Sequence, residues 1–353
     1  MKFAVLGGGS AGQGIAGYLA LKGHKINLYN RTPEKIASIA ESGNLKVSGV
    51  IKGNAKIEKA SSDMREILGD VDSILVAVRA FGHESIIKES LPYIKKNATI
   101  VVFTGYWAAL RLRSILSREQ RNDIAIAETT LLPLASEIVE EGHVKISGIK
   151  SKMRIAACPV SRTASVYKKL SSVLPQLFPG NNVLETSLES FNPVLHLPIA
   201  LFNLAEIEKK DKFEFYHDGI SPKVARVIDA IDAERMNLIK KLNLDLIKAG
   251  EVLREYYETK GSSTYEIIRN CKAYEGYVLP NVFSYVREDL LYGVVPMVSI
   301  CNLLGISAEA SKTLISSWSM VDSVDYWREG VKIDKLGMEG MDREKIFELV
   351  TNG

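Results

Sequence analysis

The chain has 353 residues, 46% of them hydrophobic and 25% charged, which is enough apolar material for more than one buried core. Its 45 basic and 42 acidic side chains give a formal net charge of +3, with no charge pattern typical of nucleic acid binding. No apolar run is long enough to cross a membrane, and no export signal precedes the first predicted strand. We therefore expect a two-domain globular protein with no nucleic acid partner and no membrane partner.

The three cysteines, Cys158, Cys271 and Cys301, lie far apart and form no C-x-x-C spacing. This pattern indicates neither a disulfide framework nor a metal site, and it fits a reducing, cytoplasmic compartment. A homodimer is one arrangement compatible with the sequence.

In the first half of the chain, short runs of β-branched and apolar residues alternate with helical stretches. That alternation predicts βαβ units and a parallel sheet of the Rossmann type. The strands expected in this sheet are Phe3–Leu6, Ile26–Tyr29, Ile74–Val78, Ile100–Phe103 and Ile124–Ala127. Three further runs, Leu45–Ile51, Val144–Ile149 and Met153–Cys158, are expected to extend or edge the same sheet.

From Glu189 onward the strand pattern fades, and apolar residues recur at helical spacing, as in Lys223–Ile247. The fold class is therefore α/β, with an N-terminal Rossmann domain followed by an all-helical C-terminal domain. We place the Rossmann domain at residues 1–184 and the helical domain at residues 185–353.

The first predicted strand leads into the run GGGSAG at residues 7–12, which has the spacing G-x-G-x-x-G. Gly7 permits a tight turn, Gly9 lets the backbone approach a pyrophosphate, and Gly12 allows close packing of helix on strand. The loop leads into a predicted helix at Gln13–Lys22, whose N-terminus faces the phosphate charge, and Ser10 and Ala11 of the loop are also expected to bind the cofactor. The position between strand and helix predicts a dinucleotide site, with a ligand-free glycine-rich turn as the alternative.

The second strand ends at Tyr29-Asn30-Arg31-Thr32, where sites that prefer NAD carry a carboxylate for the ribose hydroxyl. No carboxylate is present there. Asn30, Arg31 and Thr32 are expected to bind the cofactor, and because Arg31 can meet a 2′-phosphate, NADP(H) is favoured over NAD(H). The alternative is a solvated Arg31 and a Thr32 that caps the next helix.

Residues at the carboxyl ends of two central strands are expected to line the nicotinamide site, since ligands of such sheets bind at that edge. These residues are Ala80, Phe81, Thr104 and Gly105. His83 lies close to the same edge, where it can contact substrate or cap the following helix.

Three segments of the second half resemble the opine dehydrogenases, the NAD/NADP octopine and nopaline dehydrogenase family. They are NPVLHLPIALFN at residues 192–203, FYHDGISP at residues 215–222 followed by DAER at residues 232–235, and YVREDLLYGVVP at residues 285–296 with the tail LGM at residues 336–338. In the first half, AFGH at residues 80–83 and ETTLLP at residues 128–133 are also similar to family positions. The resemblance spans most of the chain, and the expected domain pair is like that of 6-phosphogluconate dehydrogenase.

The resemblance implies that an α-keto acid and an amino acid condense to an imine, which NAD(P)H reduces to a secondary amine. It further implies a catalytic dyad of His196 and Asp289. A proton donor near neutral pH suits such a reduction, and imidazole is the side chain that supplies one. A packed core histidine at position 196 is the alternative reading from sequence alone.

Substrate contacts are expected from His83, Asn203 and Arg287. The family commonly carries an arginine five residues before the dyad aspartate, but this chain has Ser284 there. Arg287 is the nearest replacement, although the helical period turns it away from Asp289.

Two other functions remain open at this point. One is an NADP-dependent 2-keto or hydroxy acid dehydrogenase that resembles ketopantoate reductase, a group that relies on a catalytic lysine. Lys209, Lys210 and Lys212, however, lie in a polar run typical of a solvated face. The other is a non-enzymatic protein that senses NADP(H), for which no proton donor is needed.

Overall fold

A computed structural model describes residues 1–209, 212–279 and 281–353, and the chain separates into two compact units. The first unit comprises Met1–Thr186 together with Leu349–Gly353, and the second comprises Ser187–Glu348. The division at residues 186 and 187 lies two residues beyond the predicted one, inside helix α7 (Val183–Glu189). The five C-terminal residues belong to the first unit, which the prediction of a helical domain through residue 353 did not anticipate.

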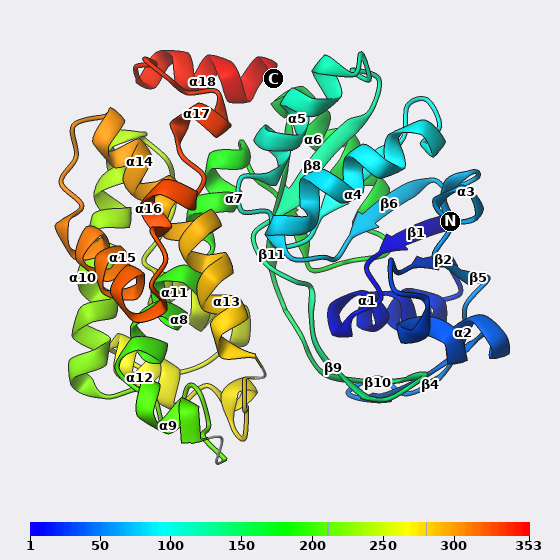
Figure 1. Cartoon of the computed structure of the whole chain (residues 1–353), viewed down its shortest axis with the longest axis horizontal. Coiled ribbons are helices and arrows are strands. Elements are labelled where there is room, and N and C mark those ends of the chain that lie inside the picture. The colour runs from blue at the N-terminus through cyan, green and yellow to red at the C-terminus, as the bar shows by residue number, and fades with distance from the viewer. Residues whose placement is uncertain (210–211, 280) are drawn as a thin grey trace. The chain divides into compact units, whose positions relative to one another are not determined.

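An eight-stranded sheet forms the centre of the first unit (Figure 1). The strands appear in the order β12 (Leu177–Pro179), β11 (Met153–Cys158), β8 (Ala125–Thr129), β7 (Thr99–Val102), β6 (Ser73–Val76), β1 (Lys2–Leu6), β2 (Lys25–Tyr29) and β5 (Lys59–Ser61). All neighbours pair in parallel except β11 and β8. The predicted Rossmann sheet is confirmed, and Met153–Cys158 extends it as an antiparallel strand.

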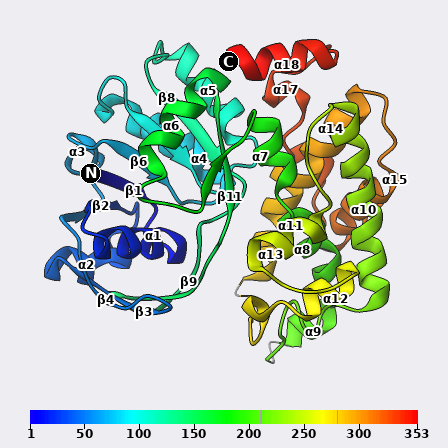
Figure 2. The ribbon, with the colours of Figure 1, turned by 180° about the vertical axis from the view of Figure 1, so that it is seen from behind.

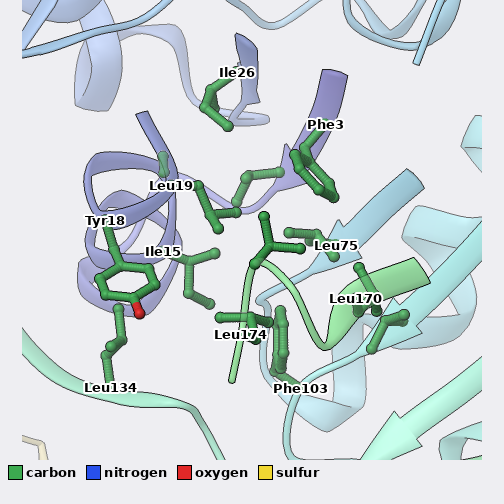
Figure 3. Packing of buried hydrophobic residues seen from close by; sticks show 14 of the residues in the cluster. Phe3, Ile15, Tyr18, Leu19, Ile26, Leu75, Phe103, Leu134, Leu170 and Leu174 are labelled. Atoms are coloured by element: carbon green, nitrogen blue, oxygen red, sulfur yellow. The ribbon is translucent and has the colours of Figure 1, made fainter. Parts of the chain in front are cut away.

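The buried strands supply both faces of this sheet with apolar side chains, because successive residues of a strand point to opposite sides. Phe3 and Val5 join one hydrophobic cluster, whereas Ala4 and Leu6 join the other. Figure 3 shows part of the first cluster, in which residues of β1 pack with Ile15 and Leu19 of α1 (Ser10–Leu21). The second cluster includes residues of α3 (Met64–Leu68), α4 (His83–Ser90) and α5 (Ala108–Arg118).

Two of the predicted strands form a separate sheet, so the expectation that they edge the main sheet is wrong. This four-stranded sheet has the order β4 (Gly53–Lys56), β3 (Asn44–Gly49), β10 (His143–Ile149) and β9 (Leu134–Glu140). It packs on α1 on the side away from the main sheet, as Figure 2 shows. Gly17 permits this close approach, since a Cβ there would lie 2.6 Å from Val47 Cγ2. A helix covered on both sides must be apolar all round, as α1 is.

The remaining helices of the first unit are α2 (Ala37–Ser42) and α6 (Thr163–Leu170), with short 3₁₀ turns at Pro33–Ile36, Ala80–Gly82, Leu91–Tyr93 and Val160–Arg162. Every regular element recorded for the described residues of the second unit is helical, as predicted. They are α8 (Asn192–Leu201), α9 (Leu204–Lys209), α10 (Pro222–Lys241), α11 (Ala249–Tyr257), α12 (Thr264–Arg269), a 3₁₀ turn (Lys272–Tyr274), α13 (Val282–Asp289), a π-helical turn (Leu290–Val294), α14 (Val295–Leu303), α15 (Glu309–Asp322), α16 (Tyr326–Glu329) and α17 (Ile333–Leu336). The last helix, α18 (Arg343–Asn352), runs to the end of the chain and includes residues of both units.

Helix α10 ends earlier than the predicted Lys223–Ile247, because Asn243 adopts a left-handed backbone (φ 53°) and Leu244 N donates back to Ile239 O. The DAER segment of this helix has a structural task. Asp232 accepts from Arg235 Nε at 2.7 Å, and the guanidinium also donates to the carbonyl oxygens of Leu188 and Ile247. This buried cluster ties α10 to α7 and to the segment that follows α10.

Among the residues that the structure describes, no helix combines the length and apolar character that a membrane span requires. Within the same ranges, no three His, Cys, Asp or Glu side chains are placed to hold a metal ion.

Candidate functional site

The glycine loop between β1 and α1 has the geometry that its spacing predicts. Gly7 adopts φ +121°, and a Cβ there would lie 2.6 Å from Ala77 O. A Cβ on Gly12 would lie only 1.6 Å from Gly7 O. Gly9, in contrast, is exposed and has nothing within 4 Å of such a Cβ. Two glycines are therefore required by the turn itself, and the third leaves open space for a ligand.

The N-terminus of α1 is suited to a phosphate group. The first amide bonded within the helix is that of Gln13, which donates to Gly9 O at 2.9 Å. The N–H groups of Ser10, Ala11 and Gly12 precede it and have no helical carbonyl to meet. No acidic side chain lies in the first turn, so the partial positive charge of the helix end is available to an anion.

Asn30 supports this loop from the end of β2. Its Oδ1 accepts from Gly8 N at 3.0 Å, and its Nδ2 donates to Thr32 O at 2.8 Å. The side chain predicted to bind cofactor thus holds the backbone of the loop in place. A contact of Asn30 with the cofactor would come in addition to this structural role.

Arg31 and Thr32 follow at the same edge of the sheet and are exposed. In the described ranges of the chain, the Arg31 guanidinium has no hydrogen-bond or ion-pair partner. Thr32 precedes the Pro33–Ile36 turn, but its hydroxyl makes no capping bond. Both side chains are therefore available for a group that lies beyond β2.

The carboxyl ends of β6 and β7 carry the other predicted cofactor residues. Ala80 is buried, whereas Phe81 is 55% exposed. After β7, Thr104 has φ 56°, and Tyr106 and Trp107 repeat this left-handed conformation. Such residues cost about 1–2 kcal/mol each and tend to collect at functional sites.

Gly105 lies inside this strained loop and packs against a buried carboxylate. Its N–H donates to Thr129 O, and a Cβ at this position would lie 2.5 Å from the side chain of Glu128. Glu128 Oε2 in turn accepts from Ala109 N at 2.8 Å, at the start of α5. Residues at the end of β8 thus fix the backbone of this loop and the start of α5.

His83 lies inside the first unit rather than at its surface. Its side chain is fully buried, Nε2 pairs with Val78 O at 3.1 Å, and Nδ1 lies 3.4 Å from Arg111 Nη2. Burial, followed by the neighbouring Arg111 charge, lowers the pKa of His83 to about 3. A neutral imidazole with both nitrogens engaged supports a structural role for His83.

In the second unit, His196 of α8 and Asp289 at the end of α13 meet in the interior. His196 Nδ1 lies 2.7 Å from Asp289 Oδ2, and the two residues are 3% and 1% exposed. Because a carboxylate only accepts hydrogen bonds, the Nδ1 atom of the imidazole carries the proton. This contact fixes the ring orientation and leaves Nε2 as the nitrogen that can take up a proton.

Local sequence explains how these two side chains are presented. Pro193 starts α8 in the first turn, where its missing amide costs nothing. Asp289 immediately precedes the π-helical turn Leu290–Val294. Pro296 then has no amide to donate to the carbonyl four residues before it, and this weakens the regular helix there. Single π turns of this kind are frequent at functional sites.

Aromatic rings surround the imidazole of His196. Phe215 and Tyr285 meet it edge-on, with ring centroids 5.7 and 6.1 Å away. The Tyr216 hydroxyl lies 2.8 Å from His196 Nε2, and the Tyr216 ring stacks on Tyr274 at 3.6 Å. Sequence reasoning assigned no tyrosine to the site. The FYHDGISP segment and the many tyrosines near it were the signal that could have found Tyr216.

Two predicted substrate residues have other partners in this structure. Asn203 Nδ2 donates to the carbonyl oxygens of Ile199 and Gly219, so it joins α8 to the loop before α10. The Arg287 side chain is 55% exposed and pairs with Glu329 at 3.4 Å. Arg287 therefore has a surface partner in this structure, and its role in place of the family arginine, whose position holds Ser284, stays a prediction.

Lys209, Lys210 and Lys212 were considered as candidates for a catalytic lysine, but neither of the two that the structure describes is buried. Lys209 is exposed and pairs with Glu206 at 2.7 Å, Lys212 is exposed, and Lys210 lies outside the described residues.

A Rossmann unit with a glycine loop, together with a helical unit that buries a His–Asp pair, defines the class of NAD(P)-dependent oxidoreductases. Residues 179–321 match the model of the NAD/NADP octopine/nopaline dehydrogenase alpha-helical domain, and residues 3–158 match that of ketopantoate reductase. The chain is 30% identical to an opine dehydrogenase of Arthrobacter sp. over 343 residues, which cover 96% of both chains. It therefore belongs to the opine dehydrogenases, which act on the imine of a keto acid and an amino acid with NAD(P)H.

Solved structures share the fold. Octopine dehydrogenase in complex with NADH and agmatine superimposes with a TM-score of 0.81 at 19% identity, covering 100% of this chain and 98% of the other. Yersinopine dehydrogenase with NADP+ bound gives a TM-score of 0.72 at 14% identity, covering 99% of this chain and 98% of the other. Relatives with this fold thus bind either nicotinamide cofactor.

Proposed function

We propose that this chain condenses an α-keto acid with an amino acid and reduces the imine, with His196 as general acid and Asp289 as its partner. The observation that carries the proposal is the 2.7 Å contact between two residues that are almost completely buried. A paired histidine and aspartate inside a helical domain, away from solvent, suits a proton transfer that the reaction needs. The pair also contributes to packing, but an apolar pair would do that with less desolvation.

The fold and the glycine loop support a cofactor on the first unit. The pyrophosphate would be held by the N–H groups of Ser10, Ala11 and Gly12, with Gly9 leaving room for it. When bound, the reduced nicotinamide supplies the hydride. Phe81, Thr104 and Gly105, near the carboxyl ends of β6 and β7, are proposed to lie beside it.

We further propose a preference for NADP(H) over NAD(H). Arg31 is exposed at the end of β2 with no partner among the described residues, and no carboxylate stands at that position for a ribose hydroxyl. A guanidinium binds phosphate oxygens through several donors, so a 2′-phosphate would give Arg31 its partner.

His196 would hold the proton that the reaction requires at a defined atom. When the carbonyl carbon of the keto acid bonds to the amine nitrogen, the carbonyl oxygen leaves as water, and both hydrogens of that water come from the amine nitrogen. The imine nitrogen then takes up one further proton when its carbon receives the hydride, and this is the proton that His196 would supply. Asp289 keeps the imidazole in one tautomer and stabilises the imidazolium form before the proton is given up. Neither residue needs to move, because both are fixed in packed helices.

The substrate classes rest on similarity. Structures of octopine dehydrogenase are described with pyruvate and with L-arginine, a keto acid and an amino acid. With Ser284 in place of the family arginine, this chain would recognise the substrate carboxylate through other groups.

The deciding experiment follows NADPH oxidation by the purified protein with a panel of α-keto acids, each presented with and without amino acids. Oxidation that requires both co-substrates supports imine reduction. Oxidation with the keto acid alone would instead favour the ketopantoate-reductase-like alternative, which the match of residues 3–158 keeps open. Cofactor binding without oxidation of NADPH by any pair would favour a sensing protein.

A further inference from the structure

Both ring nitrogens of His196 are occupied by side chains of this chain. Asp289 Oδ2 lies 2.7 Å from Nδ1, and the Tyr216 hydroxyl lies 2.8 Å from Nε2. A substrate therefore has no direct access to Nε2 unless Tyr216 moves aside. The alternative is that the proton travels through the tyrosine hydroxyl.

The hydrogen-bond roles follow from the chemistry of the three groups. With Nδ1–H donated to the carboxylate, Nε2 of the neutral ring is an acceptor, and the Tyr216 hydroxyl donates to it. In the imidazolium form Nε2 carries a proton and donates to the tyrosine oxygen. The hydroxyl hydrogen of Tyr216 is then released to point at another acceptor.

We propose that Tyr216 is a third member of the catalytic group and passes the proton between His196 and the substrate. The Tyr216 O–H bond breaks as its proton moves to the oxygen or nitrogen bonded to the reacting carbon. The Nε2–H bond of the imidazolium breaks as that proton moves to the tyrosine oxygen. The phenol ends as it began, the imidazole becomes neutral, and the hydride comes from the reduced cofactor of the established activity.

Packing favours a relay over displacement of the ring. Tyr216 is only 6% exposed, and it stacks on Tyr274 with centroids 3.6 Å apart and planes 9° from parallel. Phe215 packs edge-on against the Tyr216 ring, with the two ring centroids 5.1 Å apart. Swinging the ring out would break this stack and expose buried apolar surface, whereas a relay moves only protons.

The same surroundings keep the phenol neutral. Burial, followed by the nearby Tyr277 and Tyr257, raises the pKa of Tyr216 well above its ordinary value. A phenolate therefore does not accumulate, and the two proton movements occur together. This inference rests on the proposed role of His196, which is the group that changes charge.

The test is Tyr216→Phe, which removes one oxygen and keeps the ring and its stack. Turnover for the keto acid and amine pair should fall by about 100- to 10,000-fold, as expected when a proton donor is lost, while the NADPH dissociation constant stays unchanged. The matched control is Tyr326→Phe, which removes the hydroxyl of another buried tyrosine in the same unit, bonded to Asp322. That variant should lose stability but keep its turnover.

A second measurement tests the relay on the unmodified protein, whose result can be read whether or not the variant folds. The single-turnover rate of the unmodified protein in mixtures of H₂O and D₂O should curve with deuterium fraction, because two protons move together, and the Tyr216→Phe plot should be straight. Normal or higher turnover in Tyr216→Phe, or a straight plot for the unmodified protein, would overturn the relay. Normal turnover in His196→Ala would instead remove the proposed function itself.

Discussion

Replacing Asp289 by asparagine isolates the contribution of its negative charge. The substitution keeps the size of the side chain and an oxygen that can accept from His196 Nδ1, so the packing of α13 should survive. What changes is the ability of this residue to stabilise a charged ring. Because the two side chains are 3% and 1% exposed, water cannot replace the lost charge.

The size of the effect follows from two contributions. A hydrogen bond to a charged group is worth about 1.5–3 kcal/mol and a neutral one about 0.5–1.5 kcal/mol, so losing the charge costs about 1–1.5 kcal/mol. That corresponds to a loss of turnover of about 5- to 13-fold. If the amide presents its NH₂ group instead, the imidazole is forced into the wrong tautomer, an error that costs about 10⁴-fold in the Ser-His-Asp hydrolases. We expect a loss between these limits.

Single-turnover oxidation of NADPH by the keto acid and amine pair measures this loss, and equilibrium titration checks that cofactor affinity is unchanged. The matched control is Glu288→Gln, a buried carboxylate one residue earlier on the same helix, which should alter turnover by less than about threefold. The double variant His196→Ala with Asp289→Asn should be little worse than the worse single variant, since the two act as a unit. Equal turnover for Asp289→Asn and the unmodified protein, or fully additive losses, would refute the dyad.

Three further predictions concern the first unit. Arg31→Ala should weaken NADPH binding about 10- to 150-fold and leave NADH binding unchanged, because a charge-assisted contact is worth about 1.5–3 kcal/mol; equal losses for both cofactors would contradict the proposed preference. Gly12→Ala should lower the melting temperature, since its Cβ would lie 1.6 Å from Gly7 O. Gly9→Ala should keep the melting temperature and weaken cofactor binding. An unchanged melting temperature in Gly12→Ala would be inconsistent with this loop. His83 has a pKa of about 3 in the folded chain against about 6.5 unfolded, so its stabilising effect is complete above pH 6.5 and is lost as the pH falls toward 3. Denaturant unfolding gives the free energy of unfolding at each pH. Between pH 6.5 and pH 5 this free energy should fall by about 2 kcal/mol less in His83→Gln than in the unmodified protein. Parallel plots of the free energy against pH would exclude a buried neutral His83.

The cofactor half of the fold could be predicted from local sequence because its signals are local. The strand, the glycine spacing and the helix after it lie within about 20 residues of one another. The steric reasons for glycine at positions 7 and 12 are confirmed, since a Cβ at either position would clash with backbone atoms. The parallel strands were also recognisable, since a strand buried on both faces is apolar throughout. The small second sheet was assigned wrongly, because nothing local to β3 or β10 says which partner strand they meet.

Resemblance, rather than pattern, drew attention to His196 and Asp289, and it could not supply their surroundings. Nothing in the spacing revealed the partners of the three predicted substrate residues. Asn203 donates to backbone carbonyl oxygens, His83 lies against an arginine, and Arg287 pairs with a surface glutamate. The FYHDGISP segment pointed to the neighbourhood of Tyr216, but not to the contact of its hydroxyl with His196.

By itself, the sequence determined the two-domain class, the positions of the central parallel strands along the chain and the turn that can hold a pyrophosphate, because periodicity and glycine sterics act between close neighbours in the chain. Only the tertiary structure decided that positions 196, 216 and 289 meet at hydrogen-bond distance. The atoms that join them lie up to 93 residues apart in sequence, and their approach depends on how α8, α13 and the loop before α10 pack. Packing of that kind is set by the whole core of the second unit, which no short segment encodes.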